Sequence, residues 1–235
     1  MAQFMVLLQD ARADDAQLAP TLTRDLIEAH AAYERGLRAS GAFLDGERLR
    51  PSREGRRVRH RDGEARVELG PFAEAPLTGY YVVEAPSLEA AVALAASCPR
   101  SPDAALEVRP IMKGQLQPDK SSQPGRVFAF GVLGNATNEA AWVDVMNAID
   151  ESSREGFPAA RMLGGVRLEA PGKGRGVRNV GGHRTVFDGP FLESKEVIGG
   201  VFFLRMDTLE DAVHWAMGAA FVKIGAVEIR ELWRS

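Results

Sequence analysis

The sequence is short of cysteine, of long apolar runs and of excess charge of one sign, and each shortage excludes a class of protein. Its single cysteine, Cys98, cannot form an internal disulfide, which favours a reducing, cytoplasmic location. The N-terminal segment is a five-residue apolar stretch followed by acidic residues, so it predicts neither a signal peptide nor a membrane span. A net charge of −3 gives no reason to expect nucleic acid as a partner.

The composition that remains is that of a globular protein. Hydrophobic residues make up 45% and charged residues 26% of the chain, which excludes disordered chains, collagen and coiled coils. A chain of 235 residues is long enough for one large or two small domains, with a core that needs no disulfide or metal.

An internal repeat decides the domain organisation. Residues 49–74 align without a gap on residues 168–193, at an offset of 119, and 11 of the 26 positions are identical. Residues 79–112 then align on residues 200–233 at an offset of 121, so that Glu107 and Arg109 match Glu228 and Arg230. The chain is therefore predicted to be a tandem duplication.

The segment between the repeats has the composition of a linker. Residues 114–125 (GQLQPDKSSQPG) are rich in glycine, proline and serine and contain almost no apolar residue, which is typical of a flexible connection. We place the first repeat at residues 1–118, including the start of the linker, and the second at residues 119–235.

Each repeat is predicted to run strand, helix, hairpin, strand, helix, strand. Asp62-Gly63 and Gly181-Gly182 supply the positive φ that a two-residue hairpin turn requires. The second helix of each repeat is expected to begin at Ser87 and at Thr208, and Gly41 is expected to end the first helix. In the first repeat, strands are expected at residues 4–8, 79–84 and 105–111, helices at residues 23–40 and from residue 87, and the hairpin at residues 57–69. In the second repeat, the hairpin is expected at residues 177–187, and the first helix carries Trp142, Val145, Met146 and Ile149.

This order predicts an α+β fold of two ferredoxin-like units. An antiparallel sheet with helices on one face leaves the other face without cover. We therefore expect the two sheets to pack against each other as an internal pseudo-dimer.

The run DGPFLESKE at residues 188–196, followed by Ile198-Gly199-Gly200, resembles the signature of the YCII-related family, also called the DGPF-domain family. The first repeat resembles a diverged member, with LGPFAEAP at residues 69–76. The resemblance implies a pseudo-dimeric α+β barrel with sheet-to-sheet packing. It also implies two kinds of activity, because the wider family includes lyases and isomerases thought to use a His–Asp pair, whereas some DGPF proteins are associated with alternative sigma factors.

Asp188 and His30 are the candidate catalytic residues. Asp188 lies beside a glycine and a proline, and Leu69 takes its place in the first repeat, so the turn forms there without an acid. His30 lies in the first helix, similar in placement to the helical histidine of YciI-type members, with Asp45 as a candidate partner. Turn capping by Asp188, core packing by His30 and a turn position for Asp45 are the structural alternatives.

Two arginines are candidates for binding a ligand anion. Seven arginines lie between Arg48 and Arg61, a pattern that also suits a solvated hairpin face, and Arg59 is retained as Arg178 in the second repeat. His60, His183 and His214 have no further ligand at metal-binding spacing, so neither a metal nor another cofactor is expected.

Two functional hypotheses follow from these residues. The first is a small-molecule pocket with lyase- or isomerase-like acid–base chemistry, present once per chain because only one repeat carries each candidate residue. The second is a non-catalytic ligand-binding or protein-interaction module linked to transcriptional regulation. In both cases the expected partner is a small molecule, without nucleic acid or membrane, and the chain is expected to be a monomer or a weak homodimer.

Overall fold

The computed structural model describes residues 1–10, 12, 20–72, 76–101, 104–117, 120, 124–135, 147, 161–180, 183–188, 196–223 and 225–233. In the first repeat these form β1 (Ala2–Asp10), α1 (Pro20–Ala39), β2 (Phe43–Arg48), β3 (Arg56–Arg61), β4 (Glu64–Leu69), β5 (Leu77–Ala85), α2 (Leu88–Ala96) and β6 (Ala104–Leu116). In the second they form β7 (Arg126–Asn135), β8 (Met162–Leu168), β9 (Arg175–Val180), β10 (His183–Asp188), β11 (Glu196–Met206), α4 (Leu209–Met217) and β12 (Gly225–Glu231). Short 3-10 helices cover Ser52–Glu54 (η1), Pro171–Lys173 (η4) and Ala220–Lys223 (η5).

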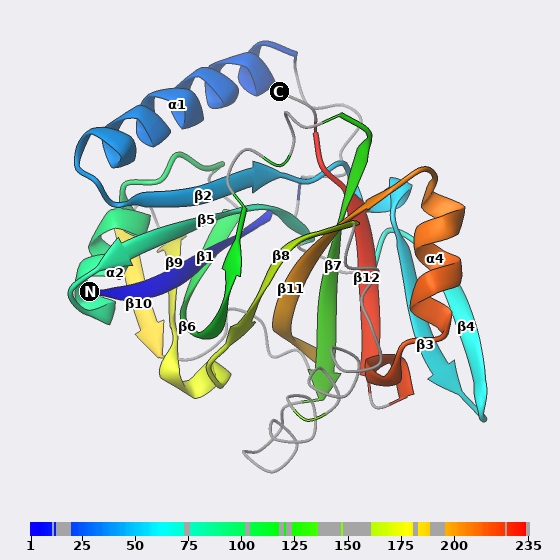
Figure 1. Cartoon of the computed structure of the whole chain (residues 1–235). Helices are drawn as coiled ribbons and strands as arrows, with labels where there is room; N and C mark the ends of the chain where they lie inside the picture. The colour runs from blue at the N-terminus through cyan, green and yellow to red at the C-terminus, as the bar shows by residue number, and fades with distance from the viewer. Residues whose placement is uncertain are drawn as a thin grey trace.

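The strands of each repeat form a ferredoxin-like antiparallel sheet. The first repeat contributes the order β2-β5-β1-β6, and the second contributes the equivalent order β8-β11-β7-β12. Helices α1 and α2 cover the outer face of the first sheet, and α4 covers the outer face of the second (Figure 1). The chain therefore has the predicted two-unit α+β architecture.

The two sheets are joined at their edges as well as packed through their inner faces. The end of β6 pairs with β8 from Ile111 to Leu116, and a bridge between Leu49 and Leu232 links the opposite edges. The side chains between the sheets form one core, in which the rings of Tyr80 and Phe203 lie 5.4 Å apart. The expected packing of the sheets is thus accompanied by edge pairing, which layer arguments did not predict.

Each hairpin pairs with a strand of the other repeat, which the order of the elements did not predict. The hairpin β3–β4 of the first repeat pairs with β12 of the second, and the hairpin β9–β10 of the second pairs with β6 of the first. Val58 accordingly packs in the core under α4, and Val177 packs in the core under α2. Each repeat therefore completes the sheet of the other by hairpin exchange.

Two strands, β2 and β8, were not predicted. Their sequences, FLDGER and MLGGVRL, combine glycine with charged residues, which are depleted in strands. Both strands hold their place through pairing, β2 with β5 and β8 with β11 and β6. Tertiary pairing thus outweighs local propensity at these positions.

The predicted starts of α2 and α4 and the predicted end of α1 are confirmed, whereas α1 starts at Pro20, earlier than the predicted residue 23. The Ser87 side chain accepts a hydrogen bond from the Ala90 backbone N–H, and Thr208 forms a capping box with Asp211. Gly41, at φ 72°, follows the last turn of α1. The first helix of the second repeat, predicted around Trp142, lies outside the described residues.

The expected linker begins inside a strand. β6 continues to Leu116, so residues 114–116 pair with β8, and Lys120 is fully buried. The start of residues 114–125 is therefore held by the sheet rather than free. No helix in the described part of the chain has the length and apolarity to span a membrane.

Candidate functional site

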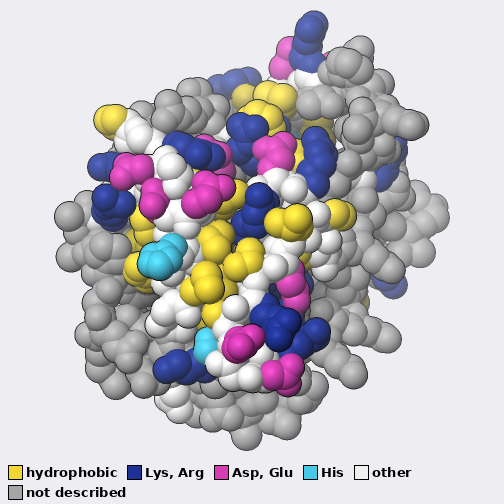
Figure 2. Space-filling view, turned by 90° about the vertical axis from the view of Figure 1, so that its right-hand side faces the viewer, with side chains coloured by type: hydrophobic (Ala, Val, Ile, Leu, Met, Phe, Trp, Pro, Cys, Tyr) yellow, Lys and Arg dark blue, Asp and Glu magenta, His cyan; other side chains and the backbone are white. Residues whose placement is uncertain are grey.

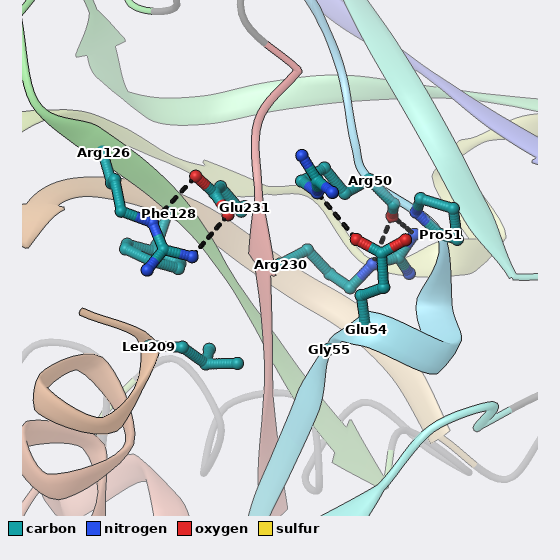
Figure 3. A pocket seen from close by; sticks show the side chains of 9 residues that line it. All are labelled: Arg50, Pro51, Glu54, Gly55, Arg126, Phe128, Leu209, Arg230 and Glu231. Carbon is teal, nitrogen blue, oxygen red and sulfur yellow. Dashed lines mark hydrogen bonds and ion pairs between the residues drawn. The ribbon is translucent and has the colours of Figure 1, made fainter.

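A pocket of about 340 Å³ opens where the two repeats meet, and we call it the seam pocket (Figure 3). Its first wall comes from the chain after β2 and from η1, and its second wall comes from β7, β12 and the start of α4. A backbone hydrogen bond of 2.9 Å from the Arg50 N–H to the Glu231 carbonyl joins the walls. The lining residues are Arg50, Pro51, Glu54, Gly55, Arg126, Phe128, Leu209, Arg230 and Glu231.

Two ion pairs face each other across the seam pocket (Figure 3). Arg126 donates from Nε and Nη2 to the two carboxylate oxygens of Glu231, at 2.9 and 2.7 Å. Arg50 Nε donates to Glu54 Oε2 at 2.7 Å. The hydrogen bond with Glu231 raises the pKa of Arg126 above its usual range, so the guanidinium is charged at any physiological pH.

The third arginine of the seam pocket, Arg230, is occupied by structural contacts. Its Nη1 donates to Glu228 at 2.9 Å, and its other nitrogens donate to the carbonyls of Arg50 and Leu77 in the first repeat. A Cβ atom at position 55 would lie 2.6 Å from the Arg230 Cδ and 2.9 Å from the Ile229 carbonyl oxygen. Glycine is therefore required where the chain crosses this arginine. Arg230 therefore forms the base of the pocket and holds its two walls together.

The lining still offers more donors than acceptors to a ligand. Among the described residues, Nη1 and Nη2 of Arg50 and Nη1 of Arg126 have no hydrogen-bond partner, and Glu54 Oε1 is the matching unpaired acceptor. Both arginine side chains are about 40% exposed, at 39% and 40%. Leu209, which is half-buried, adds apolar surface beside these donors, whereas Phe128 is fully buried, with the guanidinium of Arg126 over its ring. The arrangement suits a small molecule with an anionic group and a compact apolar part.

The repeat shows that this lining occurs once per chain. Ala2 and Pro110 occupy the positions that correspond to Arg126 and Glu231, as the strand register and the sequence offset show. Glu169 and Lys173 stand at the positions of Arg50 and Glu54. They also form an ion pair, but the acidic residue now comes first in the chain and the basic residue second. The single site expected from the sequence rested on Asp188 and His30, which do not line this pocket.

The matching arginine of the other repeat, Arg109, ties the repeats together in the same way as Arg230. It is fully buried, pairs with Glu107 at 2.8 Å, and donates to the carbonyls of Glu169 and Ile198 in the second repeat. The Glu-x-Arg motif found by the sequence repeat is thus a structural tie between the repeats.

A second group of polar side chains lies in the core between the sheets, and we call Asp45, Tyr80 and Lys120 the interior cluster. Lys120 Nζ donates to Asp45 Oδ2 at 2.6 Å and to the Gln117 carbonyl at 2.8 Å, and the Tyr80 hydroxyl donates to the same Asp45 oxygen at 2.7 Å. Burial, followed by the charge of Asp45, raises the pKa of Tyr80. The second repeat has Gly164 and Val201 at the positions of Asp45 and Tyr80, so this cluster also occurs once.

The structure does not pair His30 with Asp45. His30 Nδ1 instead lies 3.0 Å from the Tyr81 hydroxyl, under α1, whereas Asp45 contacts Tyr80 in the core between the sheets. Tyr80 and Tyr81 are consecutive in β5 and point to opposite faces, so the sheet separates the two predicted partners. The predicted His–Asp pair was therefore wrong, because β2 was not recognised as a strand.

Burial, aided by the charge of Arg48, lowers the pKa of His30 from 6.5 to about 4. The unfolded chain therefore binds a proton between pH 6.5 and 4 that folded His30 does not bind, and stability falls as pH falls through this window. We expect His30→Gln to flatten the dependence of the unfolding free energy on pH by about 2 kcal/mol between pH 7 and 4, allowing for the partial exposure of the ring. Urea unfolding at each pH measures this difference, and an NMR titration giving His30 a pKa near 6.5 would contradict it.

Asp188 lies at the end of β10, and its side chain is 87% exposed. It pairs with Arg175 of β9 at 3.1 Å. The hairpin β9–β10 adds to β6, whereas α1 packs near β2 at the other edge of the same sheet, so the structure does not bring Asp188 and His30 together. The rest of the DGPF run lies outside the described residues.

Arg59 and Arg178 lie in the exchanged hairpins and contact residues of their own hairpin. Arg59 pairs with Glu68 at 2.9 Å, and the Arg178 guanidinium lies 5.2 Å from the centre of the Phe187 ring. Neither residue lines the seam pocket, and their role in binding an anion stays a prediction. Within the described ranges, no group of three or more His, Cys, Asp or Glu side chains could hold a metal ion.

The residues of the seam pocket were not predicted from the sequence. Arg50 belonged to the arginine-rich run, but nothing local distinguished it from Arg48 or Arg53. Arg126 and Glu231 are far apart in the chain and meet because β7 pairs with β12. The one available signal was the loss of both residues at the matching positions of the first repeat.

Comparison with known proteins identifies a family. The sequence profile of the YCII-related domain matches the chain twice, over residues 2–115 and 137–235. No curated protein matches the sequence.

Solved structures show a distant likeness. A candidate chlorite dismutase (9% identity, TM-score 0.40) covers 99% of this chain and 95% of its own. A heme-binding protein from Thermus thermophilus (11%, TM-score 0.39) and an anthrone oxidase-like protein (8%, TM-score 0.40) each cover 99% of this chain and 92% of their own. Likeness at this level carries no functional argument.

Proposed function

The chain belongs to the YCII-related family, and on that premise we propose that it binds a small organic anion in the seam pocket. The observation that carries the proposal is that, counting contacts among the described residues, the lining has more unpaired guanidinium nitrogens than unpaired carboxylate oxygens. A carboxylate or phosphate group accepts hydrogen bonds from such donors in a geometry that a neutral group cannot match.

The apolar part of the lining limits the shape of the ligand. Leu209 is half-buried in the lining, whereas Phe128 is fully buried, so a ligand with a compact apolar body attached to its anionic group fits the volume best. A volume of about 340 Å³ lies at the lower end of the range for small-molecule sites. The proposed ligand is thus a small carboxylate or phosphate ester with one ring or a short branched chain.

The geometry favours binding over turnover. Both carboxylates of the lining are engaged by arginines, which leaves them poorly suited to accept a proton from a substrate. His30 and Asp188 lie away from the seam pocket, so acid–base chemistry at these residues stays a separate prediction.

Thermal shift with three matched probes tests the proposal. We expect benzoate at about 10 mM and low salt to raise the melting temperature, whereas benzamide and benzylamine do not, because only benzoate presents two anionic acceptors. Arg126→Gln should weaken benzoate binding at least about tenfold, a loss typical of one charge-assisted hydrogen bond.

Arg161→Gln is the matched control, because Arg161 is 45% exposed and pairs with Asp207 outside the pocket. The single change Arg126→Gln removes a donor and also leaves the Glu231 carboxylate without its arginine. The double variant Arg126→Gln/Glu231→Gln removes both charges, so it shows how much of the loss in affinity comes from the missing donor alone. An equal shift with benzamide, or benzoate binding that survives Arg126→Gln, would refute the proposal.

A further inference from the structure

The exchanged hairpins end in two strands, β4 and β10, that occupy equivalent places at the far edges of the strand order (Figure 1). Each pairs with one neighbour, β4 with β3 and β10 with β9, and within the described part of the chain its other edge pairs with no strand. An unpaired edge presents backbone donors and acceptors to any other strand of suitable sequence. The two edges can therefore be compared position by position.

The side chains of β4 separate cleanly into an apolar and a charged face. Val67 lies opposite the buried Val58, so Ala65, Val67 and Leu69 share the face toward α4. Val67 is 42% exposed and Leu69 is 69% exposed, and Met217 at the end of α4 is 37% exposed. The opposite face carries Glu64, Arg66 and Glu68.

Hydrophobic side chains gather on the surface at this end of the molecule. In Figure 2, which faces the right-hand side of Figure 1, they form a central group surrounded by charged side chains of both signs. An apolar centre with a charged rim is the arrangement found in protein–protein interfaces.

The equivalent edge, β10, is protected by charge. Val186 corresponds to Val67, but Arg184 and Asp188 stand on the same face at the positions of Ala65 and Leu69. Charged side chains on an edge are a common defence against pairing with another chain. The strand β10 therefore has charged side chains on this face, whereas β4 has only apolar ones. Another strand can pair with β4 without burying a charge on this face.

We propose that β4 pairs antiparallel with β4 of a second chain, about a twofold axis at Val67. In this register Val67 faces Val67 of the second chain, and Ala65 faces its Leu69. On the other face, Arg66 lies opposite Glu68 of the second chain, and this ion pair forms twice. The alternation of charge along β4 is thus self-complementary, which gives a closed dimer rather than a fibre.

Sedimentation velocity of the full chain tests the proposal. We expect a dimer whose fraction rises between about 10 and 300 µM, since an interface of one strand pair is small and its affinity modest. Arg66→Glu places a carboxylate opposite Glu68 of the second chain on both sides of the axis. It should raise the dissociation constant of the dimer at least about tenfold.

A reversal restores the complementarity. The double variant Arg66→Glu/Glu68→Arg exchanges the two charges and should recover the dimer, which a merely destabilised hairpin would not do. Arg184→Glu at the other edge is the matched control and should leave the dimer unchanged. A wild-type chain that stays monomeric over this range, a folded double variant that does not recover, or an equal effect of Arg184→Glu would overturn the proposal.

Discussion

Replacing Lys120 with alanine is expected to lower the free energy of unfolding by about 3–5 kcal/mol, the usual cost of breaking a fully buried ion pair from one side. Lys120 and Asp45 are 0% and 3% exposed, and the change leaves the Asp45 carboxylate buried with the Tyr80 hydroxyl as its remaining partner. Asp45 Oδ1 already lacks a partner among the described residues, so the carboxylate cannot compensate through its second oxygen. Urea unfolding of the variant measures the loss.

Removing the charges of both Asp45 and Lys120 distinguishes the contribution of the ion pair to stability from that of side-chain packing. The double variant Asp45→Asn/Lys120→Met should cost clearly less than Lys120→Ala, because neither partner is left charged in the core. If single and double variants lose the same stability, the ion pair contributes nothing beyond the volume of its side chains.

Replacing Arg109 with alanine is expected to cost a similar amount, again about 3–5 kcal/mol, for a related reason. Glu107 is 8% exposed at its side chain and has no partner other than Arg109 in the described ranges, and two carbonyls of the second repeat lose their donor. Arg109→Lys should recover only part of this loss, because an ammonium cannot reach both carbonyls and Glu107 as the planar guanidinium does.

The matching change in the other repeat provides the comparison. Arg230→Ala should cost less than Arg109→Ala, because Glu228 keeps a second partner, Arg57, at 2.8 Å, whereas Gly176 stands at the matching position beside Glu107. Urea unfolding of the two variants side by side measures the difference. Equal losses would show that the carbonyl contacts, rather than the buried carboxylates, dominate both ties.

The repeat made the architecture predictable, but not the connections between the repeats. The hairpins were predicted at nearly their observed positions, since their glycine-containing turns are local signals. Whether Val58 packs in its own repeat or in the other cannot be predicted from either sequence, because both cores offer the same apolar partners. Hairpin exchange is therefore a property of the assembled pair of sheets.

The same limit explains which site residues were missed. Composition predicts residues 114–125 as a flexible linker, and one lysine in it gives no sign that it is buried against Asp45. Arg126 and Glu231 become neighbours only through the pairing of β7 with β12. His30 was correctly placed on a helix, but its partner depended on β2, whose sequence is not typical of a strand.

The most direct test of the proposed function is NMR titration of the full chain with benzoate, followed through the arginine Nε–Hε signals and the histidine ring signals. The account predicts that the signals of Arg50 and Arg126 shift with one common dissociation constant, while those of His30 and Arg175, the partner of Asp188, stay in place. Shifts confined to His30 or Arg175, with Arg50 and Arg126 unchanged, would contradict it and place the ligand at the residues predicted from the sequence.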